Sequence, residues 1–67
     1  MITVSINGVP RQFDATISIA ELVTLLGYAG KRIALERNGE IVPRSTYPNV
    51  QLADGDKLEV VIAVGGG

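Results

Sequence analysis

Residues 57–64 read Lys-Leu-Glu-Val-Val-Ile-Ala-Val and form the most apolar strand-like run of the chain. The turn residues Asp54-Gly55-Asp56 precede this run, and Gly65-Gly66-Gly67 follow it. A short apolar run that is bounded by turn residues is typical of a strand in the middle of a sheet. We therefore expect residues 57–64 to form the central strand of this fold.

The start of the chain predicts a β-hairpin. Residues 2–6 alternate between apolar and polar side chains, which is the pattern of a half-buried strand. Asn7-Gly8 follows, and this pair favours a two-residue type I′ turn, because such a turn needs positive φ at both positions. The returning strand, residues 9–13, contains Pro10, which has no N–H to donate. We therefore expect this strand at an edge of the sheet.

A single main helix is predicted next. Ser18 and Glu21 have the spacing of a capping box, in which each residue satisfies a free backbone N–H of the other. Gly27 suits the left-handed position at which helices commonly stop. The apolar residues at helical spacing between these signals are Ile19, Leu22, Val23 and Leu26. A helix this short is marginal alone, so its apolar face must pack against a sheet.

A second hairpin is expected after the helix. Residues 33–37 and 40–42 read as strands that are joined by a second Asn-Gly turn at positions 38 and 39. A two-residue turn places Arg37 opposite Glu40, as a cross-strand pair of opposite charge. Pro43 ends the hairpin, and residues 44–52 look irregular, with one helical turn near residues 45–47.

These elements predict an α+β fold. Two hairpins with a helix between them are followed by an apolar last strand, and this strand closes the sheet most simply by pairing with the first strand in parallel. The arrangement is the β-grasp, or ubiquitin-like, fold: a mixed sheet of about five strands with one main helix packed on one face. We expect residues 1–64 to form this domain and residues 65–67 to form a flexible tail.

The composition excludes several kinds of chemistry. The chain has 67 residues, one small domain, and its net charge of -1 argues against a nucleic-acid binder. It contains no Cys and no His, which excludes disulfides, thiolate nucleophiles, imidazole bases and the usual zinc sites. Asp54 and Asp56 flank a glycine and are more typical of a turn than of a metal site. We predict no bound metal.

The sequence shows no signal for secretion or membrane insertion. Its first residues lack a basic start followed by an apolar segment and a cleavage site, and no apolar run reaches the roughly 20 residues that span a bilayer. We therefore expect a cytoplasmic protein that has no membrane partner.

The three terminal glycines carry the chemistry. Having no side chains, they can enter a channel too narrow for other residues. The carboxylate of Gly67 is a poor electrophile until it is activated, and conversion to an acyl-adenylate with ATP supplies a leaving group that sulfur or an amine can displace. The alternative is an inert tail on a structural or recognition module, since chain ends are often poorly ordered.

The sequence resembles the ThiS family of thiamine-biosynthesis sulfur carriers over its whole length. The first Asn-Gly hairpin and four further segments carry the resemblance: ELVTLL at 21–26, ERNGEIVPR at 36–44, DGD at 54–56 and VGGG at 64–67. A terminal Gly-Gly is also found in ubiquitin relatives and in the small subunit of molybdopterin synthase. A molybdopterin-type or other ubiquitin-like sulfur carrier, and a protein modifier, therefore remain as alternatives.

The resemblance implies a carrier, not an enzyme, with no intrinsic catalytic residue and no bound cofactor. A ThiF-type adenylyltransferase, similar to ubiquitin-activating enzymes, would adenylate Gly67 using ATP and magnesium, with Gly65 and Gly66 threading its active site. Sulfur from a persulfide relay would then form a thiocarboxylate. A ThiG-type thiazole synthase would receive this sulfur for the thiazole ring of thiamine.

The last strand also predicts a docking surface for these partners. If Glu59 faces solvent, Val61 and Ala63 share its outer face, while the alternate residues Leu58, Val60 and Ile62 point inward. An outward apolar pair beside a functional tail suits partner docking. The docking candidates are Glu59, Val61, Ala63 and Tyr47; for Tyr47 the sequence leaves open a role in bracing its loop. Glu36, Arg37 and Glu40 belong either to a solvated hairpin or to the rim of the docking surface.

Overall fold

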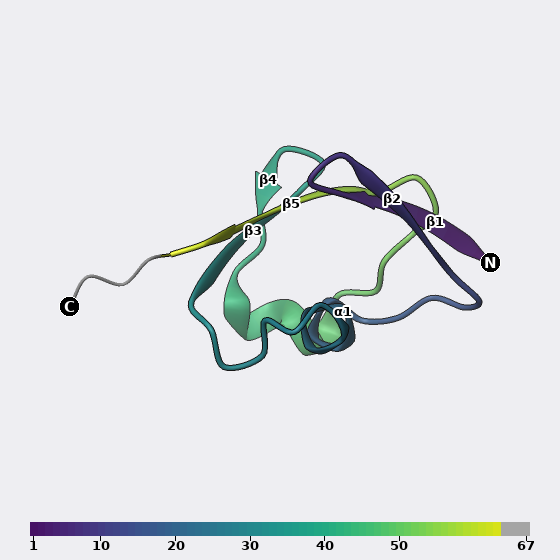
Figure 1. The fold of residues 1–67 in the computed structure, drawn as a ribbon. Coiled ribbons are helices and arrows are strands. Elements are labelled where there is room, and N and C mark those ends of the chain that lie inside the picture. Colours follow the sequence, from purple (N-terminus) through teal and green to yellow (C-terminus); the bar gives the residue numbers. More distant parts are fainter. Residues whose placement is uncertain (64–67) are drawn as a thin grey trace.

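The computed structural model describes residues 1–63, which form a mixed sheet with helical segments packed on one face (Figure 1). The strands are β1 (Ile2–Ile6), β2 (Val9–Phe13), β3 (Ile33–Arg37), β4 (Glu40–Ile41) and β5 (Lys57–Ile62), and the helices are α1 (Ile19–Leu25) and the 3-10 helix η1 (Arg44–Asn49). The predicted order of elements is confirmed. β5 runs to Ile62, and Val64, the last residue of the predicted strand, lies outside the described residues.

The sheet has the strand order β2-β1-β5-β3-β4, so β5 lies in the middle. It is parallel to β1, with Ile6 opposite Leu58, and antiparallel to β3, with Leu35 opposite Val60. β2 and β4 are the two edges, as expected for a strand that contains Pro10 and for a strand of two residues. This is the predicted β-grasp topology.

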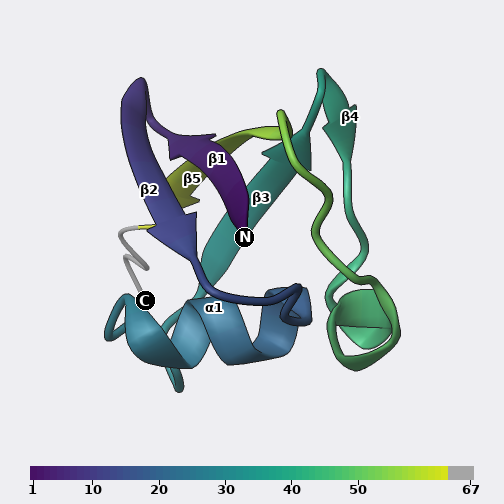
Figure 2. The ribbon, with the colours of Figure 1, turned by 90° about the vertical axis from the view of Figure 1, so that its right-hand side faces the viewer.

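The core lies between the sheet and the helical layer (Figure 2). Ile19, the first residue of α1, and Leu22, its middle residue, are fully buried. The other buried apolar residues come from the strands, η1 and the segment after it: Val4, Ile6, Leu35, Leu58, Val60, Tyr47 and Leu52. Burial of each large apolar side chain contributes about 1.5–3 kcal/mol to folding, so these few contacts hold the domain together.

The ends of α1 are capped as the sequence predicts. Ser18 and Glu21 form both hydrogen bonds of the capping box. At the other end Gly27 has φ of +81°, its N–H donates to the Thr24 carbonyl, and the Tyr28 N–H donates to the Val23 carbonyl. This pair of bonds is a Schellman motif, and it ends the helix where the glycine allows a left-handed residue.

Both Asn-Gly turns form, and each asparagine has a second role. Asn7 and Asn38 have φ of 52°, as type I′ turns require. The Asn7 side chain accepts a hydrogen bond from the Val60 N–H (2.8 Å) and donates to the Val60 carbonyl (3.1 Å). It therefore binds β5 as a further residue of β1 would, at the point where the β1 backbone turns away. The Asn38 Oδ1 accepts from the Lys57 N–H at 2.9 Å.

Candidate functional site

The predicted docking residues of β5, Glu59 and Val61, lie on the sheet face opposite α1, and Ala63 follows the strand. Glu59 and Ala63 are exposed, and Val61 between them is 62% exposed. Leu58 and Val60 alternate with these residues and are buried in the core. The predicted orientation of these five residues is therefore confirmed, and their part in docking stays a prediction.

One residue of this strand departs from the expectation. Ile62 was expected to point into the core, but it is 42% exposed. The β1–β5 pairing includes only Ser5 opposite Lys57 and Ile6 opposite Leu58, so the second half of β5 has a neighbouring strand on its β3 side only. Ile62 therefore lies beyond the part of the sheet that the core covers.

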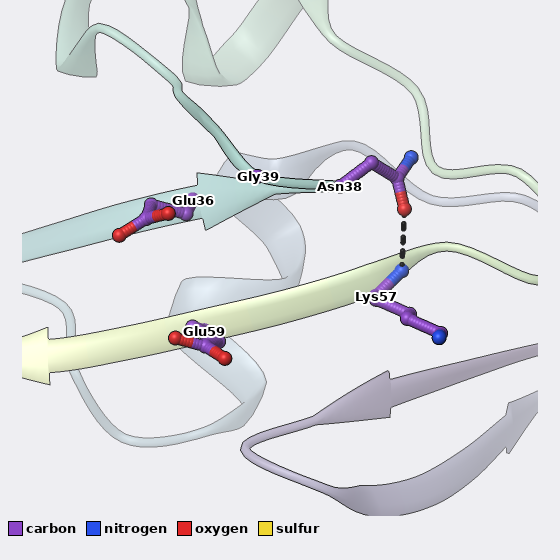
Figure 3. A pocket seen from close by; sticks show the side chains of 5 residues that line it. All are labelled: Glu36, Asn38, Gly39, Lys57 and Glu59. Carbon is purple, nitrogen blue, oxygen red and sulfur yellow. Dashed lines mark hydrogen bonds between the residues drawn. The ribbon is translucent and has the colours of Figure 1, made fainter.

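The outer face also carries two adjacent carboxylates. Glu36 on β3 and Glu59 on β5 occupy directly opposite positions in the register, and Figure 3 shows their side chains next to each other. They line a shallow hollow of about 460 Å³ together with Asn38, Gly39 and Lys57. Like charges placed directly opposite each other destabilise a sheet slightly, unless a partner neutralises them.

Apolar side chains border this acidic pair. Ile41 on β4 lies opposite Glu36 and is 67% exposed, and Val61 lies two residues after Glu59 on the same face. Exposed apolar residues beside charged ones are typical of docking surfaces, which have an apolar centre and a polar rim. We call Glu36, Ile41, Glu59, Val61 and Ala63 the outer-face patch. Lys57 lines the same hollow and offsets one of the two carboxylates, and the remaining negative charge favours a partner that presents a basic side chain.

Asp56 and Arg37 form an ion pair that the sequence did not predict. The register places Arg37 opposite Glu40 as expected, but the Arg37 Nε donates to the Asp56 carboxylate at 2.9 Å. This carboxylate also accepts from the Ala53 N–H (2.8 Å) and from the Asn38 Nδ2 (3.1 Å). The predicted cross-strand position of Arg37 opposite Glu40 is confirmed, but the ion pair that Arg37 forms in the described residues is with a carboxylate from the distant 54–56 turn.

The environment of Asp56 sets its charge. Burial alone would raise the pKa of Asp56, but hydrogen bonds from Ala53, Asn38 and Arg37, together with the Arg37 charge, outweigh it and hold the pKa below its ordinary value. Asp54 accepts a hydrogen bond from the Thr3 N–H at 2.7 Å. Within residues 1–63 no group of three or more Asp, Glu, His or Cys side chains could hold a metal ion.

Tyr47 lies in the core. Its residue is 6% exposed, and η1 places it against α1. Burial raises the pKa of Tyr47, and the nearby Arg44 charge partly offsets this effect. The burial of the ring favours the bracing role that the sequence left open, and the hydroxyl is the part of this side chain that keeps some exposure.

The chain leaves the fold at the end of β5, on the side opposite the N-terminus (Figure 1). The Ala63 N–H donates to the Arg32 carbonyl at 2.8 Å, which anchors this end to the segment before β3. The predicted functional glycines Gly65, Gly66 and Gly67 lie outside the described residues. What the structure supplies is a fixed starting point for them, in the central strand.

Several structural residues had only weak signals in the sequence. The side chains of Asn7 and Asn38 form hydrogen bonds with residues of β5 that lie 53 and 19 positions away in the sequence. An Asn-Gly pair by itself predicts only the turn, so these hydrogen bonds could not be predicted from it.

Among the helices of the described residues, none is long and apolar enough to cross a membrane.

Comparison with known proteins agrees with the fold and the segments described above. The model of the ThiS family matches residues 4–67. A thiazole synthase of Paramagnetospirillum magneticum is 48% identical over 62 residues, covering 92% of this chain and 19% of that protein. The sulfur carrier protein ThiS of Bacillus subtilis is 38% identical over 52 residues, covering 78% of this chain and 79% of the carrier.

A solved structure shows the same fold. The crystal structure of the thiamine biosynthesis protein ThiS from Geobacter metallireducens superposes with a TM-score of 0.82 at 29% identity, covering 98% of this chain and 100% of that one. A second thiazole synthase, from Magnetococcus marinus, is 39% identical over 64 residues, 96% of this chain. The chain spans only 19% and 20% of the length of the two thiazole synthases.

Proposed function

The chain belongs to the ThiS family of thiamine-biosynthesis sulfur carriers, and on that premise we propose that its sulfur is carried on the carboxyl group of Gly67. The carboxylate oxygen attacks the α-phosphorus of ATP, pyrophosphate leaves, and an acyl-adenylate forms. The terminal sulfur of a persulfide donor then displaces AMP at the acyl carbon and forms an acyl disulfide between the donor and the chain. A thiol attacks the donor sulfur of this disulfide, the S–S bond breaks, and the products are the thiocarboxylate and a disulfide between the donor and the thiol.

The observation that carries this proposal is that the family match runs through Gly67 and includes the three glycines. The position of β5 supports it. The start of β5 is paired with β1 and β3, and its end is held by β3 and by the hydrogen bond from the Ala63 N–H to the Arg32 carbonyl, so the described part of the chain is anchored up to Ala63. Glycines that follow such a strand can enter a narrow active site, because they have no side chains that would clash with its walls.

The partners in this proposal supply all the catalysis. A ThiF-type adenylyltransferase would bind ATP and magnesium and adenylate Gly67, a persulfide donor would supply sulfur, and a ThiG-type thiazole synthase would accept it. The similarity of this chain to about one fifth of two proteins named thiazole synthase supports the last partner. The chain itself acts as a co-substrate of these enzymes and holds no ATP or magnesium.

The outer-face patch is the proposed docking surface for the adenylyltransferase. We expect Val61→Asp to raise the KM for the carrier in ATP–pyrophosphate exchange by about tenfold or more, because a new charge would be buried in the interface. Gln12→Asp is the matched control, since Gln12 is exposed on β2 opposite Thr3, away from the end of β5. An equal effect of both substitutions would contradict this docking surface.

Intact mass spectrometry tests the chemistry directly. The intact mass of the protein purified from its native host is measured first, and this mass establishes whether the mature chain ends at Gly67. The protein is then incubated with the adenylyltransferase, ATP, magnesium and a persulfide donor. The expected product is heavier by the difference between sulfur and oxygen.

Truncation provides the control for this experiment. Removal of Gly66 and Gly67 should leave the circular dichroism spectrum unchanged, because glycines contribute no side-chain contacts to the core, and should abolish adenylation. Sulfur transfer by the truncated chain would refute the proposal. Thiocarboxylate formation with a molybdopterin-pathway activating enzyme alone, or conjugates with lysines of other proteins, would assign the chain to one of the alternative carrier classes.

A further inference from the structure

A second hollow lies on the helical side of the sheet, between the C-terminal end of α1, the segment before β3, and η1. Its volume is about 220 Å³. Apolar groups, including Val23 and Ile33, form part of its wall, and the charged groups that line it are Lys31 and Arg44. The lining contains no carboxylate, and the one ion pair among residues 1–63 involves neither cation. We call this hollow the α1–η1 cavity.

Tyr47 contributes a hydroxyl that the described residues leave without a partner. The residue is 6% exposed and lines the α1–η1 cavity. No side-chain hydrogen bond within residues 1–63 includes its hydroxyl. All fully buried polar side-chain atoms of these residues have partners, so the Tyr47 hydroxyl must keep some exposure, and the cavity is the hollow that the residue lines.

The hydroxyl and the two cations favour an anion in the cavity. Arg44 and Tyr47 lie three residues apart in η1, and both line this cavity. A guanidinium and a hydroxyl donate hydrogen bonds well to a carboxylate, and a bond that involves an ionised group is roughly twice as strong as a neutral one. Lys31 and Arg44 are exposed in the free protein, so a docked partner that covers the hollow would remove the water that competes for these bonds.

The cavity also lies beside the point where the chain leaves the fold. Ile33, in its wall, is opposite Ile62 at the end of β5, and Arg32, between Lys31 and Ile33, accepts the Ala63 N–H. An enzyme that acts on the end of the chain approaches this side of the domain. The cavity is separate from the outer-face patch, which lies on the opposite face of the sheet.

We infer that the α1–η1 cavity is a docking pocket for one Asp or Glu side chain of the enzyme that adenylates Gly67, held by Arg44, Lys31 and the Tyr47 hydroxyl. The inference rests on the proposed function. It adds a second contact of opposite charge, since the outer-face patch is acidic and this pocket is basic. A partner with a basic group at one position and an acidic group at the other would bind this small domain in a single orientation.

The test is the KM for the carrier in ATP–pyrophosphate exchange, catalysed by the adenylyltransferase of the same organism. We expect Arg44→Gln to raise this KM by about tenfold or more, the usual effect of losing a charge-assisted hydrogen bond, with kcat unchanged. Tyr47→Phe should raise it by about threefold, with no loss of thermal stability, because the hydroxyl has no partner in the free protein. Arg44→Lys keeps the charge and should restore part of the affinity.

Arg11→Gln is the matched control, because Arg11 is exposed on the edge strand β2 and the substitution changes the net charge by the same amount. It should leave the KM within about twofold of the wild-type value, since a distant surface charge acts only through the screened field. A KM for Arg44→Gln or Tyr47→Phe that matches the wild type would overturn the inference, as would an equal rise with Arg11→Gln. If the wild-type chain itself supports no exchange, the proposed function fails and this inference fails with it.

Discussion

Replacement of Asp56 should weaken the fold more than replacement of any exposed carboxylate. Its side chain is 7% exposed and accepts hydrogen bonds from the Ala53 N–H, the Arg37 Nε and the Asn38 Nδ2. Asp56→Ala leaves three donors without this acceptor. An unsatisfied buried group costs about 1–3 kcal/mol, but Arg37 is 29% exposed and regains water. We therefore expect a loss of about 2–4 kcal/mol in the free energy of unfolding.

The pH dependence gives this prediction a definite sign. Because the folded-state pKa of Asp56 is below its unfolded value, the carboxylate stabilises the fold fully at pH values well above about 4. This stabilisation is lost as the pH falls through the lower, folded-state pKa. Asp56→Asn removes the charge with little change in shape, so the gap in stability between wild type and this variant should be largest near neutral pH and should shrink in acid.

Urea denaturation followed by circular dichroism at pH 7, 5 and 3 measures this gap. For a domain of this size a change of 1 kcal/mol shifts the melting temperature by about 4–8 °C, so thermal scans give a second estimate for Asp56→Ala. Asp14→Asn is the control, because Asp14 is exposed and makes no side-chain hydrogen bond within residues 1–63. It should change stability by less than about 0.5 kcal/mol. A gap for Asp56→Asn that is as large at pH 3 as at pH 7 would refute the reasoning.

Three further substitutions test local features of the fold. Asn7→Gly keeps the positive φ of the turn but removes both hydrogen bonds to Val60. We expect the free energy of unfolding to fall by about 1–2 kcal/mol and the Val60 amide to exchange its hydrogen faster. Unchanged exchange would contradict the role of the side chain. Ser18→Ala removes the helix cap and should cost about 1 kcal/mol in urea denaturation, whereas an effect within error would show that the cap is dispensable. Glu36→Gln should stabilise the fold by about 0.2–1 kcal/mol at low salt and by less at 1 M salt, since it relieves repulsion with Glu59; destabilisation at low salt would count against this account.

The sequence predicted most elements of this fold because their signals are local. Ser18, Glu21 and Gly27 lie within a few turns of the helix they delimit, and each Asn-Gly pair fixes its own hairpin register. Even the central place of β5 followed from its own composition. Such features are decided by backbone geometry over two to ten residues, where a pattern has few alternatives.

The features that the sequence did not predict depend on distant residues. A local rule pairs Arg37 with Glu40, but the Asp56 carboxylate comes from a turn nineteen positions away and forms the ion pair instead. Ile62 follows the alternation of its strand, yet its exposure is decided by where β1 ends. The two roles considered for Tyr47 differ only in burial, which no short pattern determines. The candidate docking surfaces also combine residues from different strands and helices, so their composition depends on strand register and on helix packing.

The two borders of the sheet have a consequence for the behaviour of the protein at high concentration. Pro10 interrupts the row of donors along β2, and β4 is only two residues long. Edge strands with unpaired backbone N–H and C=O groups are the usual sites at which further chains pair and form fibrils. The edge strands β2 and β4 offer few such groups to an incoming chain. A small protein that exposes Ile41 and Val61 is thereby protected against fibrillar self-association.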